Sequence, residues 1–327
     1  MERRQRMIEE TAADVRQAVE RIGELVRCTP LRRSASFSVD LNAEVFFKLE
    51  NDQSTGSFKL RGATNRLLTL SEEQRARGCV AASSGNHGAA VARAMQKLGI
   101  AGIIFVPERT SAAKVEKIRS YGGDVRYFGT DGLDTEQHAR EYAESQGMFY
   151  LSPYNDEEVI AGQGTCGVEI IEQLPDVEAV FIAVGGGGLM AGIGSVLKAH
   201  DPEIRMYGCQ PLASPVMARS IEAGEILDLP SEPTLSDGTA GGLEAGAVTF
   251  PVNQAVVDDW ILVDEQQIAD AMRLYMAREE GVIEGAAGVA VAGLLANREA
   301  IKGKKVAVVI CGGNISADTL AGVTDKT

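Results

Sequence analysis

The feature that most limits how this chain can fold is an alternation of short apolar runs with amphipathic segments from about residue 40 onward. "AEVFFKLE" (43–50) and "CVAASS" (79–84) are strand-like, and "GNHGAAVARAMQKLG", after the second run, has apolar residues at helical spacing. Apolar runs that are each followed by an amphipathic helix are typical of parallel strands covered by helices on both faces. The sequence therefore predicts an α/β protein with largely parallel sheets.

Two sets of such segments, separated near residue 150, predict two doubly wound lobes. We expect residues 52–149 to form a small domain, and residues 1–51 together with 150–327 to form a large domain. Further helices are predicted over 10–26 and 286–297. Ligands of doubly wound sheets bind beyond the carboxyl ends of the strands, so the strand-to-helix turns are the places to search for a site.

Charge and composition restrict the function classes. The net charge is −14 and the pI is near 4.8, so the field of the protein repels nucleic-acid backbones and anionic lipid. Apolar runs such as "VAVVI" are shorter than the roughly 20 residues of a membrane span, and the N-terminus lacks the apolar core of a signal peptide. The 5 cysteines form no C-x-x-C pair, which fits reduced thiols in the cytoplasm.

A lysine stands where one of the helices is predicted to begin. In "DQSTGSFKLRGATN" (52–65), Ser57 is the predicted N-cap and Lys59 lies in the first turn. A cation there opposes the positive end of the helix dipole, which favours the neutral amine. Lys59 is therefore a candidate for a lysine whose neutral form is used, and the alternative is a solvated surface lysine.

Three turns that follow predicted strands are candidate binding sites. "SSGNHG" (Ser83 to Gly88) offers free N–H groups at a helix start, which suit an anion, although an ordinary Ser/Asn-capped helix is the alternative. "GGGG" (Gly185 to Gly188) costs roughly 0.5–1 kcal/mol of backbone entropy per glycine, which a phosphate cradle would justify. "CGGN" (Cys311 to Asn314) places a thiol at a strand end, where it is either reactive or a small core residue.

The glycine run also fits the loose dinucleotide pattern G-x-G-x-x-[GA] as "GGGLMA" (186–191). A nicotinamide site requires an acidic residue about 20 residues later, and Gln210 ends the next predicted strand instead. A nicotinamide dehydrogenase is therefore the weaker alternative. A neutral lysine, a phosphate cradle, an anion-binding helix start and a polar group at a strand end together suit pyridoxal phosphate.

Five motifs, "STGSFKLRGA", "SSGNHG", "IAGQGT", "VGGGGL" and "CGGN", occur in an order and spacing that resemble the threonine/serine dehydratases and serine racemases. These are pyridoxal-phosphate enzymes of the tryptophan-synthase-β fold, also called fold type II. The resemblance implies a cofactor in the cleft between the two lobes, with residues 1–51 and 150–327 as the large cofactor-binding domain. The resemblance extends from about residue 15 to the end and implies β-elimination of L-threonine or L-serine to a 2-oxo acid and ammonia. It leaves open a serine racemase, a dehydratase of 3-hydroxyaspartate or phenylserine, and a non-catalytic ligand-binding relative.

The resemblance implies roles for individual residues. Lys59 is expected to form the Schiff base with the cofactor and to remove the Cα proton, while Asn86 contacts the ring hydroxyl and Cys311 faces the ring nitrogen. The other expected contacts are Phe58, Gly185, Gly186, Gly187, Gly188, Leu189 and Glu284 for the cofactor, and Ser83, Ser84, Gly85, Asn86 and His87 for the substrate. Ser84 also stands where serine racemases carry a second base, so racemisation stays open beside carboxylate binding.

The chemistry of Cys311 can be argued without the resemblance. A thiol has too high a pKa to protonate a pyridine nitrogen, whereas a carboxylic acid would protonate it. An unprotonated ring is the weaker electron sink, which favours elimination over transamination. The segment "SDGTAGG" (236–242) is expected to line the substrate side.

Expectations about metals and assembly also rest on the resemblance. Relatives bind a divalent cation after the strand that corresponds to "YGCQP", where this chain has Gln210, Ser214 and Val216. None of the three is a carboxylate, so no divalent metal is expected, while a monovalent cation held by carbonyls stays open. We expect a homodimer or homotetramer, with helix 10–26 as a candidate interface, and no regulatory domain after "CGGN".

Overall fold

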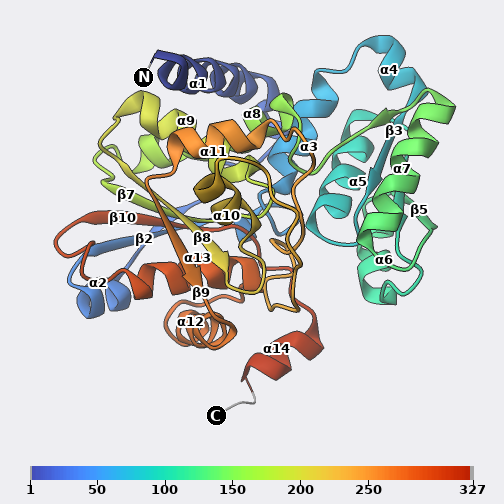
Figure 1. Ribbon diagram of the computed structural model, residues 1–327. Coiled ribbons are helices and arrows are strands. Elements are labelled where there is room, and N and C mark those ends of the chain that lie inside the picture. Colours follow the sequence, from blue (N-terminus) through green and yellow to red (C-terminus); the bar gives the residue numbers. More distant parts are fainter. Residues whose placement is uncertain (1, 325–327) are drawn as a thin grey trace.

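The polypeptide folds into two lobes, each built around its own β-sheet (Figure 1). The structure, a computed structural model, describes residues 2–324. In sheet order, the six strands of the larger lobe are β1 (Leu31–Ser34), β2 (Glu44–Leu49), β10 (Lys305–Ile310), β7 (Ala179–Ala183), β8 (Arg205–Pro211) and β9 (Asp259–Val263). The four strands of the smaller lobe are β5 (Asp124–Tyr127), β4 (Gly102–Val106), β3 (Cys79–Ala82) and β6 (Phe149–Tyr150).

The predicted fold class is confirmed. Within the two sheets, β1 and β2 pair antiparallel and all the other neighbouring strands pair parallel. The small sheet draws all its strands from residues 79–150, whereas the large sheet takes strands from before and after that segment. This arrangement supports the domain limits of 52–149 against 1–51 with 150–327, which we retain as a proposal.

Helices cover both faces of the large sheet, as parallel strands require. On one face α13 (Gly285–Ala296) packs against β7, β8, β9 and β10, and α12 (Glu265–Arg278) packs outside it. On the other face α8 (Glu157–Gln173) and α9 (Gly188–His200) pack together beneath α1 (Glu2–Ile22). The remaining helices of this lobe are α2 (Ala35–Leu41), α10 (Val216–Ala223), α11 (Thr249–Val256) and α14 (Ala317–Thr324), with short 3-10 turns at Gly23–Leu25 and Glu50–Asp52.

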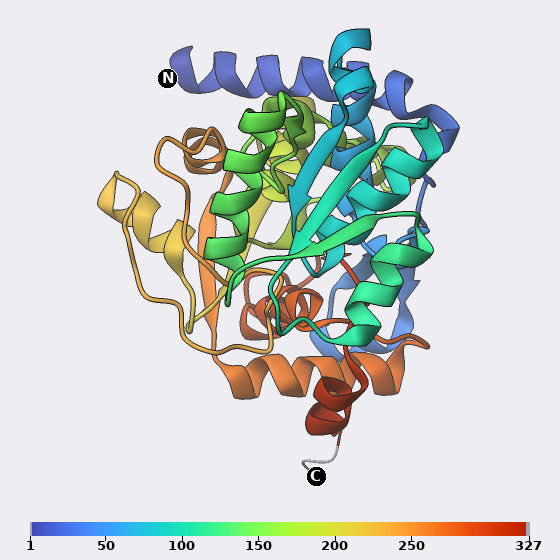
Figure 2. The same ribbon diagram turned by 90° about the vertical axis from the view of Figure 1, so that its right-hand side faces the viewer.

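The small lobe follows the same plan on a smaller scale. Its helices are α3 (Lys59–Leu68), α4 (Glu72–Arg77), α5 (Asn86–Leu98), α6 (Ala112–Ser120) and α7 (Gly132–Gln146). Figure 2 looks at the molecule from the side of this lobe and shows α1 lying across the top. Because α1 contacts α3 as well as α8 and α9, it spans the junction of the two lobes.

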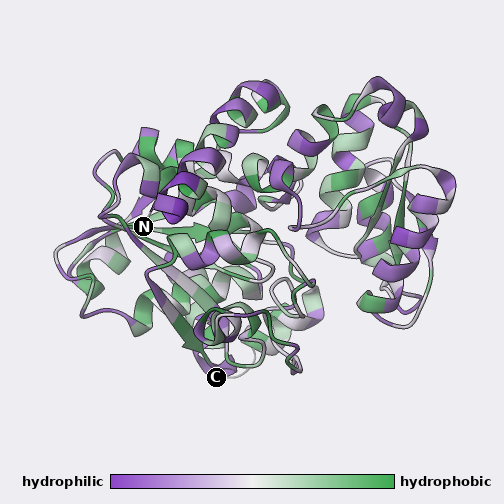
Figure 3. Cartoon of the chain, turned by 45° about the horizontal axis from the view of Figure 1, so that its top comes forward, coloured by the Kyte–Doolittle hydropathy of each residue, from purple (hydrophilic) through white to green (hydrophobic). Residues whose placement is uncertain are grey.

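The apolar residues collect on the strands and on the inner helix faces of both lobes (Figure 3). The larger core includes the β7 and β10 strands, whose residues Val180, Phe181 and Val308 are fully buried. In the smaller lobe Ala81, Ile104 and Leu151 occupy the corresponding interior. Each lobe therefore has buried apolar residues behind the turns at the edge that faces the other lobe.

The "IAGQGT" motif belongs to α8 and serves close helix packing. A Cβ at Gly162 would overlap the backbone of α3 at Arg61, and a Cβ at Gly164 would meet Gly192 of α9. Only glycine allows the three helix backbones to approach this closely. The motif thus holds α3, and with it the start of the small lobe, against the large lobe.

Buried charges join the lobes at the same place. The Arg61 guanidinium on α3 forms bidentate pairs with Glu50 at 2.7 Å and with Glu169 of α8 at 2.6–2.8 Å. Lys48 of β2 donates to Glu169 at 2.6 Å. Arg61, Lys48 and Glu50 are fully buried, and Glu169 is nearly so. Two cations therefore balance two carboxylates inside the protein, which is the condition under which buried ions are tolerated.

Two details of the sequence prediction are wrong. The helix expected over 10–26 begins at Glu2 and ends at Ile22. Ser57 is not the N-cap of α3, because Phe58 takes that position without a side-chain hydrogen bond. The backbone of Ser57 is instead held in an isolated bridge with Gly312, and its buried hydroxyl has no partner among the described residues.

Among residues 2–324 no helix combines the length and apolar character that crossing a bilayer requires.

Candidate active site

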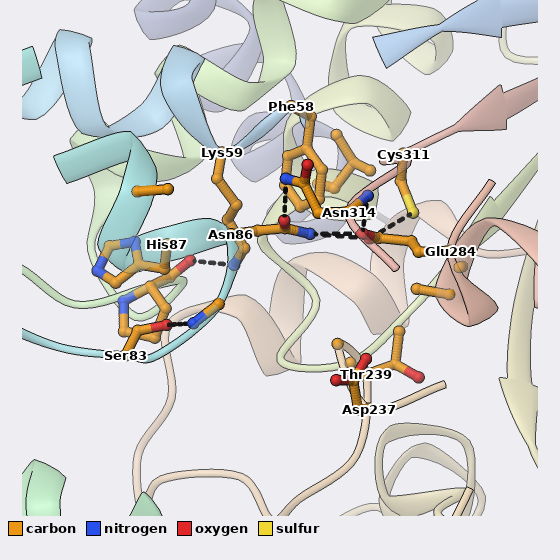
Figure 4. Close-up of a pocket in the computed structure, with 18 of the residues that line it drawn as sticks. Phe58, Lys59, Ser83, Asn86, His87, Asp237, Thr239, Glu284, Cys311 and Asn314 are labelled. Atoms are coloured by element: carbon orange, nitrogen blue, oxygen red, sulfur yellow. Dashed lines mark hydrogen bonds between the residues drawn. The ribbon is translucent and has the colours of Figure 1, made fainter. Parts of the chain in front are cut away.

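A cavity of about 510 Å³ lies between the lobes, at the carboxyl ends of strands from both sheets (Figure 4). Such a volume is typical of a small-molecule site. All residues that the sequence analysis selected for cofactor or substrate line it: Phe58, Lys59, Ser83, Ser84, Gly85, Asn86, His87, Gly185, Gly186, Gly187, Gly188, Leu189, Glu284 and Cys311. Their placement together is a structural fact, and the individual roles remain predictions.

Lys59 is the first residue of α3, and the large lobe fixes its position. The N–H of Phe58 donates to the carbonyl of Cys311 at 3.0 Å, next to the Ser57–Gly312 bridge. The Lys59 ammonium donates to the carbonyl of Pro153 at 2.8 Å. Lys59 lines the cavity and is only partly buried as a residue, but its ammonium is enclosed by protein. This burial lowers the pKa of Lys59 to about 8, although Cys311 and Glu284 oppose the shift.

The turn before Lys59 requires glycine. Gly56 has a φ of +76°, and a Cβ there would overlap the Asn314 side chain. Left-handed backbone is easily reached only by glycine, so the turn and the close approach select the same residue. Gly56 thereby allows the segment that carries Lys59 to pack against the "CGGN" turn, which follows β10.

The glycine run forms the turn between β7 and α9. Gly187 has a φ of +83° and is the N-cap of α9, and its carbonyl accepts a hydrogen bond from Asn253 at 3.0 Å. The ring of Tyr154 lies over this turn so closely that a Cβ at Gly186 would overlap it. The free N–H groups at the start of α9 therefore face the cavity side of a tightly packed turn, which suits a phosphate.

The "SSGNHG" turn connects β3 to α5. Ser83 accepts a hydrogen bond from the N–H of Gly85 at 3.1 Å, which shapes the turn, and Asn86 is the first residue of the helix. His87 is buried and forms a 2.9 Å hydrogen bond with the Leu151 carbonyl through Nε2. Burial, with a contribution from Lys59, lowers the pKa of His87 to about 3. His87 is therefore neutral and donates to Leu151, which supports the turn.

Glu284 and Cys311 lie together on the large-lobe side. Glu284 is 5% exposed, and burial is the largest of the effects that raise its pKa to about 7. Its carboxylate accepts hydrogen bonds from the Asn86 amide at 2.8 and 2.9 Å and from the Asn314 N–H at 3.1 Å. The Cys311 thiol is 4.0 Å from Glu284, and burial followed by this carboxylate raises the pKa of Cys311 well above its usual value.

The structure adds residues that the sequence analysis gave no role. Asn314 links "CGGN" to Asn86 through a 2.6 Å hydrogen bond, and Lys117 of α6 donates to the side-chain Oδ1 of Asn314. Tyr154 covers the glycine turn. These residues carry no pattern that marks them, since Lys117 is one lysine of an amphipathic helix and Tyr154 stands in a loop.

The segment 236–242 contributes the outer part of the cavity. Asp237, Gly238 and Thr239 line it, and Lys114 of α6 lies 3.6 Å from the Asp237 carboxylate across the opening. The expectation that this segment lies beside the cavity therefore agrees with its position. Lys114 also places a cation near the opening, where none had been located from the sequence.

The candidate cation residues lie elsewhere. The buried Gln210 amide donates to the carbonyl of Val184 at 3.0 Å and accepts from the N–H of Ala218 at 2.7 Å. Ser214 accepts hydrogen bonds from Ser231 and from the N–H of Gly241. Both side chains are thus used by protein groups. Among the residues that the structure describes, there is no group of 3 or more His, Cys, Asp or Glu side chains that could hold a metal ion.

The cavity fits pyridoxal phosphate on its own chemistry. A lysine of lowered pKa can form a Schiff base near neutral pH, and the start of α9 offers N–H groups to a phosphate. Cys311 stays a protonated thiol and cannot protonate a pyridine nitrogen. Lys59, the glycine turn and Cys311 are the residues that would hold the cofactor.

Comparisons with known proteins agree with this chemistry. The sequence pattern of a family described as "Pyridoxal-phosphate dependent enzyme" matches residues 22–312. The L-threonine ammonia-lyase of Thermotoga maritima is 40% identical over 316 residues, which are 97% of this chain and 78% of that protein.

Two solved structures are similar over nearly their whole length. The processed threonine deaminase isoform 2 of Solanum lycopersicum has a TM-score of 0.92 and 33% identity, covering 97% of this chain and 92% of that one. Maize serine racemase has a TM-score of 0.89 and 34% identity, covering 96% of both chains.

Proposed function

The chain belongs to the pyridoxal-phosphate-dependent enzymes, and on that premise we propose that it catalyses β-elimination of L-threonine or L-serine to a 2-oxo acid and ammonia. The observation that carries the proposal is Lys59. Its amine has a pKa near 8 and lies in one cavity with a glycine turn and a thiol that is too weak an acid to protonate a pyridine nitrogen. Relatives named for threonine ammonia-lyase activity support the reaction.

The cofactor, when bound, withdraws electrons from the substrate Cα and makes its proton acidic. Lys59, as the neutral amine, is the base that removes this proton. The N–H groups at the start of α5, with Ser83 and Ser84, bind the substrate carboxylate. Loss of the Cα proton and of the β-hydroxyl as water leaves an enamine, which hydrolyses to the 2-oxo acid and ammonia.

Cys311 favours elimination over transamination. Burial and the neighbouring Glu284 raise its pKa well above the usual value, so the thiol holds its proton at neutral pH. The thiol is far too weak an acid to protonate a pyridine nitrogen. An unprotonated ring would stabilise negative charge at Cα poorly, and this favours departure of the β-substituent with that charge.

The first test is an absorbance scan of the protein supplied with pyridoxal phosphate, before and after L-threonine or L-serine, with detection of 2-oxo acid. The wild type should show the absorbance of a lysine-bound cofactor and should form oxo acid. Lys59→Ala should lose that absorbance and at least about 10³-fold in kcat/KM, because it removes both the anchor and the base. The matched control is Lys97→Ala, an exposed lysine in the last turn of α5. Full turnover by Lys59→Ala would overturn the assignment.

A serine racemase is the second candidate, and the likeness to maize serine racemase favours it. Ser84 lines the cavity and is the candidate for the second base. Formation of D-serine from L-serine, lost in Ser84→Ala while oxo-acid formation persists, would establish racemisation. Oxo acid without D-serine would leave Ser84 as a carboxylate ligand.

We also propose the cytoplasm and a homodimer or homotetramer. The 5 cysteines are all free thiols, which fits a reducing compartment. The buried residues of α1, among them Ala12, Val15 and Ala18, pack within the chain, so only its polar face is available to a partner subunit. No divalent metal is proposed, and a monovalent cation held by carbonyls stays an alternative.

A further inference from the structure

Lys117 reaches from the small lobe into the centre of the site. It lies on α6 and is half-buried, and its ammonium donates to the side-chain amide oxygen Oδ1 of Asn314 in the large lobe. Burial lowers the pKa of Lys117, while the nearby Glu284 carboxylate acts in the opposite direction. A lysine that only served solubility would extend into water, where its charge is best solvated. The position of the Lys117 ammonium therefore indicates a function within the cleft.

The ammonium sets the direction of a chain of hydrogen bonds. An ammonium has donors only, so Asn314 must turn its oxygen toward Lys117. The Asn314 amide nitrogen then donates to the carbonyl of Thr55 at 2.9 Å and to the oxygen of Asn86 at 2.6 Å. With its oxygen occupied, Asn86 has to present its N–H groups to its remaining neighbour, which here is Glu284. Figure 4 shows Asn314, Asn86 and Glu284 joined in this order.

We propose that Lys117 is a positioning residue of the cofactor site: it fixes Asn86 as a hydrogen-bond donor toward Glu284 at the cavity wall, and it favours the ionised carboxylate of Glu284. The inference rests on the proposed function, since it concerns how the same cavity holds pyridoxal phosphate. An Asn86 that always donates suits an anionic or carbonyl oxygen and rejects a donor. Without Lys117, both asparagine amides are free to rotate and to present an oxygen instead.

The charged groups around Glu284 determine in which direction the loss of Lys117 shifts the pKa of Glu284. Burial raises its pKa, and Asp237, from the segment at the cavity opening, raises it further. The Asn86 amide, the Asn314 N–H and the Lys117 ammonium lower it. Lys59 from α3 and the protonated Cys311 complete the ionisable groups near it. Removing Lys117 takes away its lowering cation, so Glu284 should keep its proton to a higher pH.

The first experiment measures the affinity of the apoenzyme for pyridoxal phosphate by absorbance titration. Lys117→Met should weaken the affinity about fivefold or more, as expected for losing the fixed direction of one polar contact. Lys117→Arg keeps a cationic donor and should restore most of the affinity. Arg119→Met is the matched control, because it removes one positive charge from the exposed side of α6. This control should stay within about twofold of the wild type.

The second experiment follows the pH dependence. The acid limb of the kcat profile should move to higher pH in Lys117→Met, and this shift should vanish when Glu284→Gln is added to both backgrounds. A merely structural defect would move the urea midpoint of the apoenzyme and leave the acid limb in place.

The outcomes separate the two proposals. If the wild type binds no pyridoxal phosphate, the proposed function fails. If the wild type binds and turns over but Lys117→Met matches Arg119→Met in affinity and pH profile, the role of Lys117 alone is overturned.

Discussion

Lys59 and Glu284 carry opposite charges when ionised, yet burial shifts the pKa of each toward neutrality, to about 8 and about 7. The site therefore holds groups whose protonation changes close to neutral pH. Groups of this kind are suited to proton transfer, because their pKa values lie near the working pH. The same burial that makes them useful also makes the apoenzyme sensitive to pH.

Glu284 should make the apoenzyme less stable as pH rises. Its pKa is raised in the folded state, so its contribution is fully present below about pH 4.5 and is lost as pH rises through about 7. We expect the free energy of unfolding of the wild type, relative to Glu284→Gln, to fall by up to about 3 kcal/mol between pH 4.5 and 7, from a shift of about 2.5 pKa units. Urea unfolding of both proteins across this range measures it. Parallel pH curves would show that Glu284 titrates normally.

At the scale of single elements, the Tyr154 ring packs against the glycine turn between β7 and α9. The turn therefore depends on a residue from a distant loop as well as on its own glycines. That dependence can be tested apart from the conformational freedom of glycine, because Gly186 does not have a positive φ.

Gly186→Ala should weaken cofactor binding by at least about tenfold, since its Cβ would overlap the Tyr154 ring and displace the turn. Adding Tyr154→Ala should recover part of the loss by opening space. Gly132→Ala is the control, because a Cβ there meets nothing within 4 Å. Titration with pyridoxal phosphate measures all four proteins, and equal affinities for Gly186→Ala and Gly132→Ala would contradict the overlap.

The elements and much of the site could be predicted from the sequence because the relevant signals are local. Apolar runs followed by amphipathic helices predicted the strands, a helix start located Lys59, and turns at strand ends located Gly185 to Gly188 and Cys311. The Ser57 cap was wrong because pairing with Gly312, far away in the sequence, replaces local capping. Lys117 was not predicted as a site residue for the same reason. Its role depends on a contact with Asn314, which is far away in the sequence and leaves no local pattern.

At the scale of the whole molecule, the buried ions around Arg61 connect α3 to the large lobe. Arg61→Met should lower the free energy of unfolding by roughly 3–5 kcal/mol, because it leaves two buried carboxylates with Lys48 alone. Urea unfolding of the apoenzyme measures this. Arg6→Met, which breaks an exposed pair with Glu10, should leave it nearly unchanged. A loss for Arg61→Met as small as that of Arg6→Met would show that the carboxylates are relieved by water.

The position of β10 affects how the protein is made. The last strand of the described residues, β10, lies inside the large sheet, between β2 and β7, while the small sheet is complete by residue 150. During synthesis the small lobe can close while the large sheet is still two separate pieces with open edges, which are prone to wrong pairing. Cys311 and Asn314 follow β10 directly. A ribosome-bound chain therefore cannot complete this site until β10 has emerged, so the site forms only after the strands of the small lobe are available.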